Sequence, residues 1–141
     1  MDLVTYNTAK LAKKCGFNLF VQNKYLKGGG LTLRYGQPID YNNKCFQDKG
    51  RMYTSAPTQS ELQKWLRETY GFNIVIKPVG EEVINYLPEI YTSIFPDEVY
   101  DAYEEIFYSN YERCLEDCLS QSLENLLKYE FVNTSLSTKK I

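Results

Sequence analysis

Histidine is absent from the chain of 141 residues. Without histidine, neither a Ser-His-Asp nor a Cys-His catalytic group can form, and the common zinc hydrolase sites and HNH-type nucleases are excluded. The phosphate-binding pattern G-x-x-x-x-G-K-[ST] is also missing, although glycines occupy positions 28–30. We therefore predict that the protein is not an enzyme and that it has no catalytic residues, no metal site and no cofactor.

Long apolar runs are missing as well. No stretch of about 18 apolar residues is present, which argues against a transmembrane helix. The N-terminal sequence MDLVTYNTAKLAKK lacks the apolar core of a secretory signal. The four cysteines do not have the density of a disulfide scaffold, so we expect reduced thiols and a cytoplasmic protein. Cys114 and Cys118 share the apolar side of a predicted helix, which favours buried side chains over metal ligands.

Charge is unevenly distributed along the chain, although the net charge is only −2. Residues 1–80 carry 12 Lys and Arg against 5 Asp and Glu, whereas residues 81–131 carry 13 Asp and Glu against two basic residues. Such an uneven distribution of charge fits a basic surface for nucleic acid or an acidic helix that imitates DNA. It also fits two halves that attract each other, within one fold or head to tail between copies in a homo-oligomer.

The first third of the chain predicts a short helix over residues 5–15, followed by a β-hairpin. Apolar side chains flank the glycines at 28–30, and Leu31, Leu33 and Tyr35 alternate with polar residues after them. Alternation with a period of two around glycines is typical of a hairpin. Residues 36–54 are rich in Gly, Pro, Asn and Asp and predict a loop, with a short strand near Met52.

The central segment predicts a helix that begins at Thr58. Thr58 and Glu61 match the S/T-x-x-E capping box, and Gly71 is placed to end the helix. Alternating residues 72–76 then predict a strand, which Pro78 is expected to end. The predicted core consists of Leu62, Trp65, Leu66, Ile74, Ile76, Leu115 and Leu119.

The last third predicts irregular structure or a short strand over residues 79–96, and then acidic helix over 97–131. The polar Ser109-Asn110 pair is expected to divide this stretch into two helices if it is not one long helix. Residues 132–141 predict a flexible tail. The whole pattern indicates one α+β domain over residues 1–131, with helices on one face of a small antiparallel or mixed sheet. This sheet is predicted to consist of the first hairpin and the strand after the central helix.

Three segments resemble small proteins of phages and prophages of Bacteroidales-type gut bacteria. SAPTQSELQKWLRETYGFNIVI is similar to a central block of those proteins, and NTAKLAKKCGF and YERCLEDCLSQSLENLL are similar to their terminal helices. The chain departs from them in the glycine hairpin and in residues 97–109. These relatives have no assigned activity, so the resemblance implies a phage origin and the cytoplasm of an infected bacterium, but no function.

The leading hypothesis is a phage accessory protein of unknown function that acts by binding a host or phage protein and not as an enzyme. Its predicted surfaces are the acidic face of residues 97–124 and the tyrosine-rich residues 86–111. The predicted protein-binding residues are Glu104, Glu105, Tyr108, Glu112 and Glu116.

Two alternatives remain. A basic hairpin with aromatic side chains resembles a platform on which single-stranded bases stack, which predicts nucleic-acid binding by the N-terminal half. The residues in this prediction are Lys24, Tyr25, Lys27, Arg34 and Tyr35. The second alternative is an acidic mimic of DNA that inhibits a host factor. No membrane partner is expected.

Overall fold

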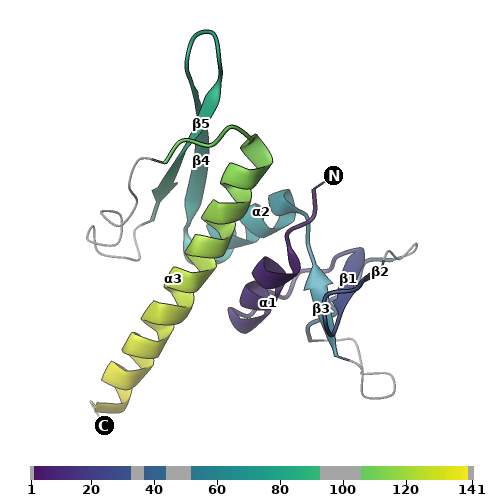
Figure 1. Ribbon diagram of the computed structural model, residues 1–141. Coiled ribbons are helices and arrows are strands. Elements are labelled where there is room, and N and C mark those ends of the chain that lie inside the picture. Colours follow the sequence, from purple (N-terminus) through teal and green to yellow (C-terminus); the bar gives the residue numbers. More distant parts are fainter. Residues whose placement is uncertain (1, 33–36, 44–51, 93–105, 140–141) are drawn as a thin grey trace. The chain divides into compact units, whose positions relative to one another are not determined.

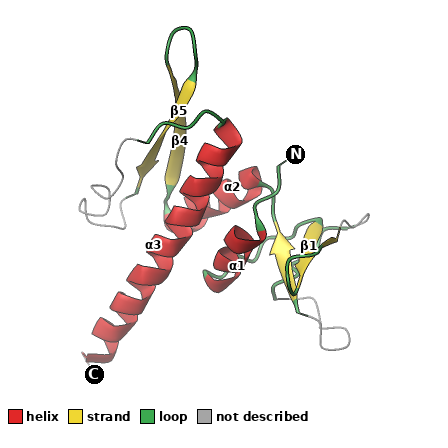
Figure 2. Ribbon diagram, viewed as in Figure 1, coloured by secondary structure: helices red, strands yellow, loops and turns green. Residues whose placement is uncertain are grey.

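The computed structural model describes residues 2–32, 37–43, 52–92 and 106–139 and has an α+β fold, as the sequence predicts (Figures 1 and 2). Its strands form a three-stranded antiparallel sheet in the order β2-β1-β3 and a separate β4-β5 hairpin. The elements in chain order are α1 (Tyr6–Lys14), β1 (Asn23–Leu26), β2 (Leu31–Thr32), β3 (Tyr53–Ala56), α2 (Gln59–Tyr70), β4 (Asn73–Val79), β5 (Asn85–Tyr91) and α3 (Tyr111–Lys139).

The chain forms two compact units, which differ in charge. One contains residues 1–4 and 58–119, with 14 Asp and Glu against four Lys and Arg, a net charge of −10. The other contains residues 5–57 and 120–141, with 12 Lys and Arg against four Asp and Glu, a net charge of +8. We call them the acidic unit and the basic unit. Whether the two behave as the single domain expected over residues 1–131 stays a prediction.

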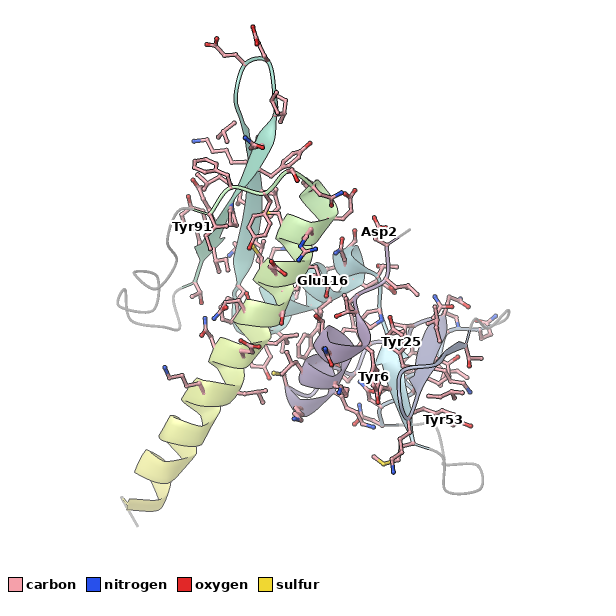
Figure 3. All side chains as sticks on the ribbon, viewed as in Figure 1. Asp2, Tyr6, Tyr25, Tyr53, Tyr91 and Glu116 are labelled. Atoms are coloured by element: carbon pink, nitrogen blue, oxygen red, sulfur yellow. The ribbon has the colours of Figure 1, made fainter. Side chains whose placement is uncertain are left out.

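In the basic unit, α1 packs against the three-stranded sheet through β3. The Thr5 side chain caps the helix by accepting a hydrogen bond from the Thr8 amide. Below the helix, the rings of Tyr6 and Tyr25 lie 5.4 Å apart, and Figure 3 shows the two side chains together. This aromatic pair joins the first turn of α1 to β1 and fixes which face of the sheet is covered.

In the acidic unit, α2 has the predicted capping box. The Thr58 side chain accepts a hydrogen bond from the Glu61 amide at 3.1 Å, and the Glu61 carboxylate accepts one from the Thr58 amide at 2.8 Å. The helix ends at Gly71, whose φ of 74° is left-handed, as predicted. Its apolar side buries Leu62 and Trp65, and α2 packs against β4.

The strand after α2 is longer than predicted, because β4 continues through Pro78 to Val79. In the antiparallel register Pro78 lies opposite Tyr86, and both backbone groups of Tyr86 bond to Tyr108. Tyr86 therefore turns its backbone N–H and C=O away from β4, and the backbone of Pro78, the residue opposite, likewise faces away from β5. Proline has no N–H to donate, so it fits this outward-facing position without loss of a ladder bond.

The structure corrects the expected arrangement of strands. The sequence predicted that β4 would join the first hairpin in one sheet, whereas β4 pairs with β5 in a sheet of its own. Only residues 80–84 separate β4 from β5, so this local pairing costs little loop entropy. The turn is tight at Gly80, which has a φ of 118° and where a Cβ atom would overlap the carbonyl oxygen of Val83.

The acidic C-terminal helix α3 begins at the break that the sequence predicts for a divided helix. Residues 106–110 are not helical, and α3 begins at Tyr111, directly after the predicted Ser109-Asn110 break. The Asn110 side chain accepts a hydrogen bond from the Arg113 amide at 2.9 Å, which caps the helix. Residues 97–105 of the predicted helix lie outside the described residues. The helix extends to Lys139, so most of the predicted tail is helical.

The predicted core is largely confirmed. Six of its seven residues are buried, and Ile76 is half-buried. On α3 the buried side continues with Leu123, which the sequence analysis did not name.

The capping box gives a stability prediction. Thr58→Ala removes the acceptor of the Glu61 amide and should lower the free energy of unfolding by about 1 kcal/mol. Chemical denaturation followed by circular dichroism measures the change. Ser60→Ala, at an exposed position in the same first turn, is the matched control and should change stability by less than about 0.5 kcal/mol. Equal losses in the two variants would contradict the assigned role of the cap.

Candidate protein-binding surface

The β4–β5 hairpin has one covered face and one exposed face. On the covered face, Ile74 and Ile90 lie opposite each other and are only 7% and 9% exposed. The side chain of Gln63 on α2 donates a hydrogen bond to the Ile74 carbonyl oxygen at 3.1 Å, which holds α2 beside this part of β4. Because side chains alternate along a strand, the neighbouring residues point to the opposite face.

A third segment extends this hairpin beside β5. Tyr108 pairs with Tyr86 through two backbone hydrogen bonds of 2.7 and 2.9 Å, and Figure 1 shows the segment before α3 crossing the hairpin. In an antiparallel bridge the two paired side chains share a face. Tyr108 therefore points to the covered face with Tyr86, and Phe107 points to the exposed one.

The exposed face collects apolar side chains from all three segments. Val75 is 45% exposed, Tyr91 57% and Phe107 54%, while Leu87 of β5 is half-buried between them in register. We call Val75, Leu87, Tyr91 and Phe107 the outer face. Single exposed apolar residues are common on proteins, but a group brought together by backbone pairing is typical of an interaction site.

Charged side chains accompany the outer face. Glu89 lies opposite Val75, and its carboxylate accepts a hydrogen bond of 2.6 Å from the Tyr91 hydroxyl. This bond raises the pKa of Tyr91 above its usual value of 10.0. Lys77 lies opposite Leu87, and the loop at the end of the hairpin adds the exposed Glu81 and Glu82. The hairpin thus combines apolar surface with an excess of negative charge.

Tyr108 is a predicted binding residue, but the structure turns it inward. Its hydroxyl donates a hydrogen bond to Asp117 on α3, and burial together with that carboxylate raises its pKa to about 12. On the same side, the rings of Tyr86 and Tyr111 meet edge to face with centroids 5.6 Å apart. These contacts attach the start of α3 to the hairpin. Tyr108 therefore supports the strands of the outer face from the covered face.

The other predicted protein-binding residues serve partly to join helices. Gln59, in the first turn of α2, donates hydrogen bonds to the Glu112 carbonyl oxygen at 2.8 Å and to the Glu116 carboxylate at 3.2 Å. Glu116 is half-buried on α3 (Figure 3), and the Glu112 side chain is exposed. Glu104 and Glu105 lie outside the described residues. The carboxylates are therefore not gathered on one described surface.

Two of the predicted nucleic-acid residues, Lys24 and Tyr25, are engaged within the basic unit. The Tyr25 ring is only 9% exposed and packs on Tyr6, so it presents no free surface for a base. The Lys24 ammonium lies 3.9 Å from the ring centroid of Tyr53 and 5.4 Å from that of Tyr41. Such cation–π contacts hold the charge on the protein. Lys27 is exposed, and Arg34 and Tyr35 lie outside the described residues.

The cysteines on α3 are buried, as predicted. Cys114 and Cys118 are 0% and 2% exposed, and burial raises the pKa of each thiol. Cys15 is buried as well, and its thiol donates to the Leu123 carbonyl oxygen at 3.5 Å. Within the part of the chain that the structure describes, no three acidic or cysteine side chains come together as a metal site.

Leu87, Tyr91 and Phe107 lie within the predicted surface of residues 86–111, although the sequence analysis did not single them out, and Val75 lies outside that range. Residues 79–96 were predicted only as irregular structure or a short strand, so β5 was not firmly expected. The usable signal was the alternation in NYLPEIY, which the proline at position 88 interrupts.

Comparison with models of protein families, with curated proteins and with solved structures found no match. The resemblance to phage proteins therefore stays a prediction. None of the helices in the described part of the chain has the length and apolar character needed to cross a membrane.

The environment of Tyr108 predicts a pH dependence. Its pKa is about 12 in the folded protein and 10.0 ordinarily, so folding favours the protonated hydroxyl. The resulting stabilisation is complete below pH 10 and is lost as the pH rises from 10 to 12. Titration of tyrosinate absorbance, compared between wild type and Tyr108→Phe, should yield a difference curve centred near pH 12. In Asp117→Asn the centre should move down but stay above 10, because burial is the larger cause. A difference curve centred near 10 would contradict the assignment.

The buried cysteines predict slow reaction with thiol reagents. In a Cys45→Ser background, Cys15, Cys114 and Cys118 should react about a hundredfold more slowly in the folded protein than in denaturant. Quantitative labelling at neutral pH, read by mass spectrometry of peptides, measures each rate. Rapid labelling of Cys114 or Cys118 in folded protein would show that α3 opens from its surroundings far more often than its burial indicates.

Proposed function

We propose that the chain is a non-enzymatic protein-binding module whose outer face contacts the partner. One observation carries this proposal: backbone pairing brings exposed apolar side chains from β4, β5 and residues 106–108 onto one face. Burying one such side chain in an interface contributes about 1.5–3 kcal/mol. Aromatic residues such as Tyr91 and Phe107 are the usual anchors of protein interfaces.

The local structure of the outer face suits docking. Its side chains project from paired strands, and contacts to α2 and α3 support these strands from the covered face. A face held in this way loses little conformational freedom when a partner binds. The resemblance to phage proteins adds the proposal that the module is a phage accessory protein, that the partner comes from the phage or its bacterial host, and that they meet in the bacterial cytoplasm.

Nucleic-acid binding is the second candidate, supported by the net charge of +8 on the basic unit. The contacts of Tyr25 and Lys24 give it less support than the sequence did, because a stacking platform requires exposed rings and accessible cations. Salt-sensitive mobility shifts with single-stranded DNA would favour this candidate. The third candidate, inhibition of a host factor by DNA mimicry, is supported only by the acidic unit's net charge.

The experiment compares capture by matched variants. The outer-face variant Val75→Thr/Phe107→Thr replaces two exposed apolar side chains by a residue that favours strands. The control Leu31→Thr/Met52→Thr removes two side chains of similar exposure, 46% and 45%, from the basic unit. Each protein is immobilised and exposed to a lysate of the organism that carries the gene.

We expect to find a protein that wild type and control both retain. The outer-face variant should retain about tenfold less of it, or even less. Circular dichroism of the variants verifies that the fold is kept. Equal retention by all three chains would contradict a binding role for the outer face.

A further inference from the structure

The partner that fits the outer face can be described by its charge. The acidic unit, which contains the whole outer face, has a net charge of −10. Within the hairpin itself, Glu81, Glu82 and Glu89 outnumber the single cation Lys77. A potential of this sign attracts cationic groups and repels anionic ones over roughly a Debye length, about 8–10 Å at physiological ionic strength.

This charge argues against two acidic units meeting through their outer faces. A symmetric pair would bring two copies of the same negative surface together, with the Glu89 residues of both copies near the contact. Like charges placed opposite each other in an interface are strongly unfavourable. The outer face is thus better suited to a partner surface of opposite charge than to the outer face of a second copy.

The arrangement of side chains specifies the partner further. Val75 lies directly opposite Glu89, and Tyr91 bonds to that same carboxylate, so apolar and anionic groups alternate within one row of contacts. A matching surface presents apolar side chains to Val75 and Phe107, with lysine or arginine beside them to meet Glu89 and Glu82. Arginine and lysine stems also cover apolar surface while their charged ends reach a carboxylate.

We infer that the outer face binds a cationic segment of another protein, one that carries apolar side chains interspersed with lysine or arginine. This inference rests on the proposed function, because it names the class of partner for the same surface. It excludes acidic segments and neutral apolar segments as preferred partners.

The probe is a fluorescent amphipathic peptide of leucine and lysine, compared with peptides in which glutamine or glutamate replaces every lysine. Fluorescence anisotropy with the full chain should show that the lysine peptide binds about tenfold or more tightly than the glutamine peptide. The glutamate peptide should not bind. Raising the salt from about 0.05 M to about 0.3 M should weaken the lysine peptide several-fold, because screening shortens the range of the attraction.

Two pairs of variants locate the binding. Glu82→Gln/Glu89→Gln should weaken the lysine peptide about fivefold, whereas Glu68→Gln/Glu124→Gln, with the same change of net charge on α2 and α3, should weaken it less than twofold. The outer-face variant should lose most of the binding, and Leu31→Thr/Met52→Thr should retain it. Equal effects of the two glutamate pairs would overturn the inference, since net charge alone would then explain the binding.

The two proposals can fail separately. If capture from the lysate depends on Val75 and Phe107 but is unchanged by Glu82→Gln/Glu89→Gln, the cationic partner is wrong and the binding surface stands. If neither capture nor peptide binding depends on Val75 and Phe107, both proposals fail.

Sedimentation of the full chain at low salt should show a monomer. Oligomers that disappear in the outer-face variant would identify a second copy as the partner and would overturn the inference.

Discussion

The pairing of Tyr86 with Tyr108 determines how the acidic unit is built. Two backbone hydrogen bonds attach residues 106–110 to β5, and α3 begins three residues after Tyr108. The same pairing decides the direction of each side chain, because residues alternate along the segment. Tyr108 meets Asp117 on the covered face, and Phe107 is left on the other. The packing of α3 and the composition of the outer face are therefore two results of one register.

Local signals predicted much of this fold. The capping box at Thr58, the left-handed Gly71 and the glycine hairpin each depend on a few neighbouring residues, and each is present in the structure. The prediction that β4 joins the first hairpin was wrong, because β5, the neighbouring strand with which β4 pairs, was not firmly predicted. The predicted surface of residues 86–111 contains Phe107 but not Val75, because these two residues are 32 positions apart in sequence and only pairing through β5 relates them.

The acidic unit combines two properties that usually oppose each other. Exposed apolar surface promotes association of any kind, whereas a large net charge of one sign keeps surfaces of that sign apart. Placing the apolar side chains of the outer face on the acidic unit therefore disfavours contact between the outer faces of two copies. Cys114 and Cys118 are buried, which also keeps reactive sulfur away from this surface.

Proline in β4 has a consequence for how any partner can approach. The outward edge of that strand offers the backbone groups of residues 74, 76 and 78, because these share the orientation of the residues opposite them. Gln63 already occupies the carbonyl oxygen of residue 74, and Pro78 has no N–H. An added strand would find few groups to pair with, so growth of the sheet by strand addition, the route to cross-β fibres, is obstructed at this edge. This edge therefore suits the proposed mode of binding, in which a partner lies across the face of the hairpin and is selected by side chains rather than by backbone.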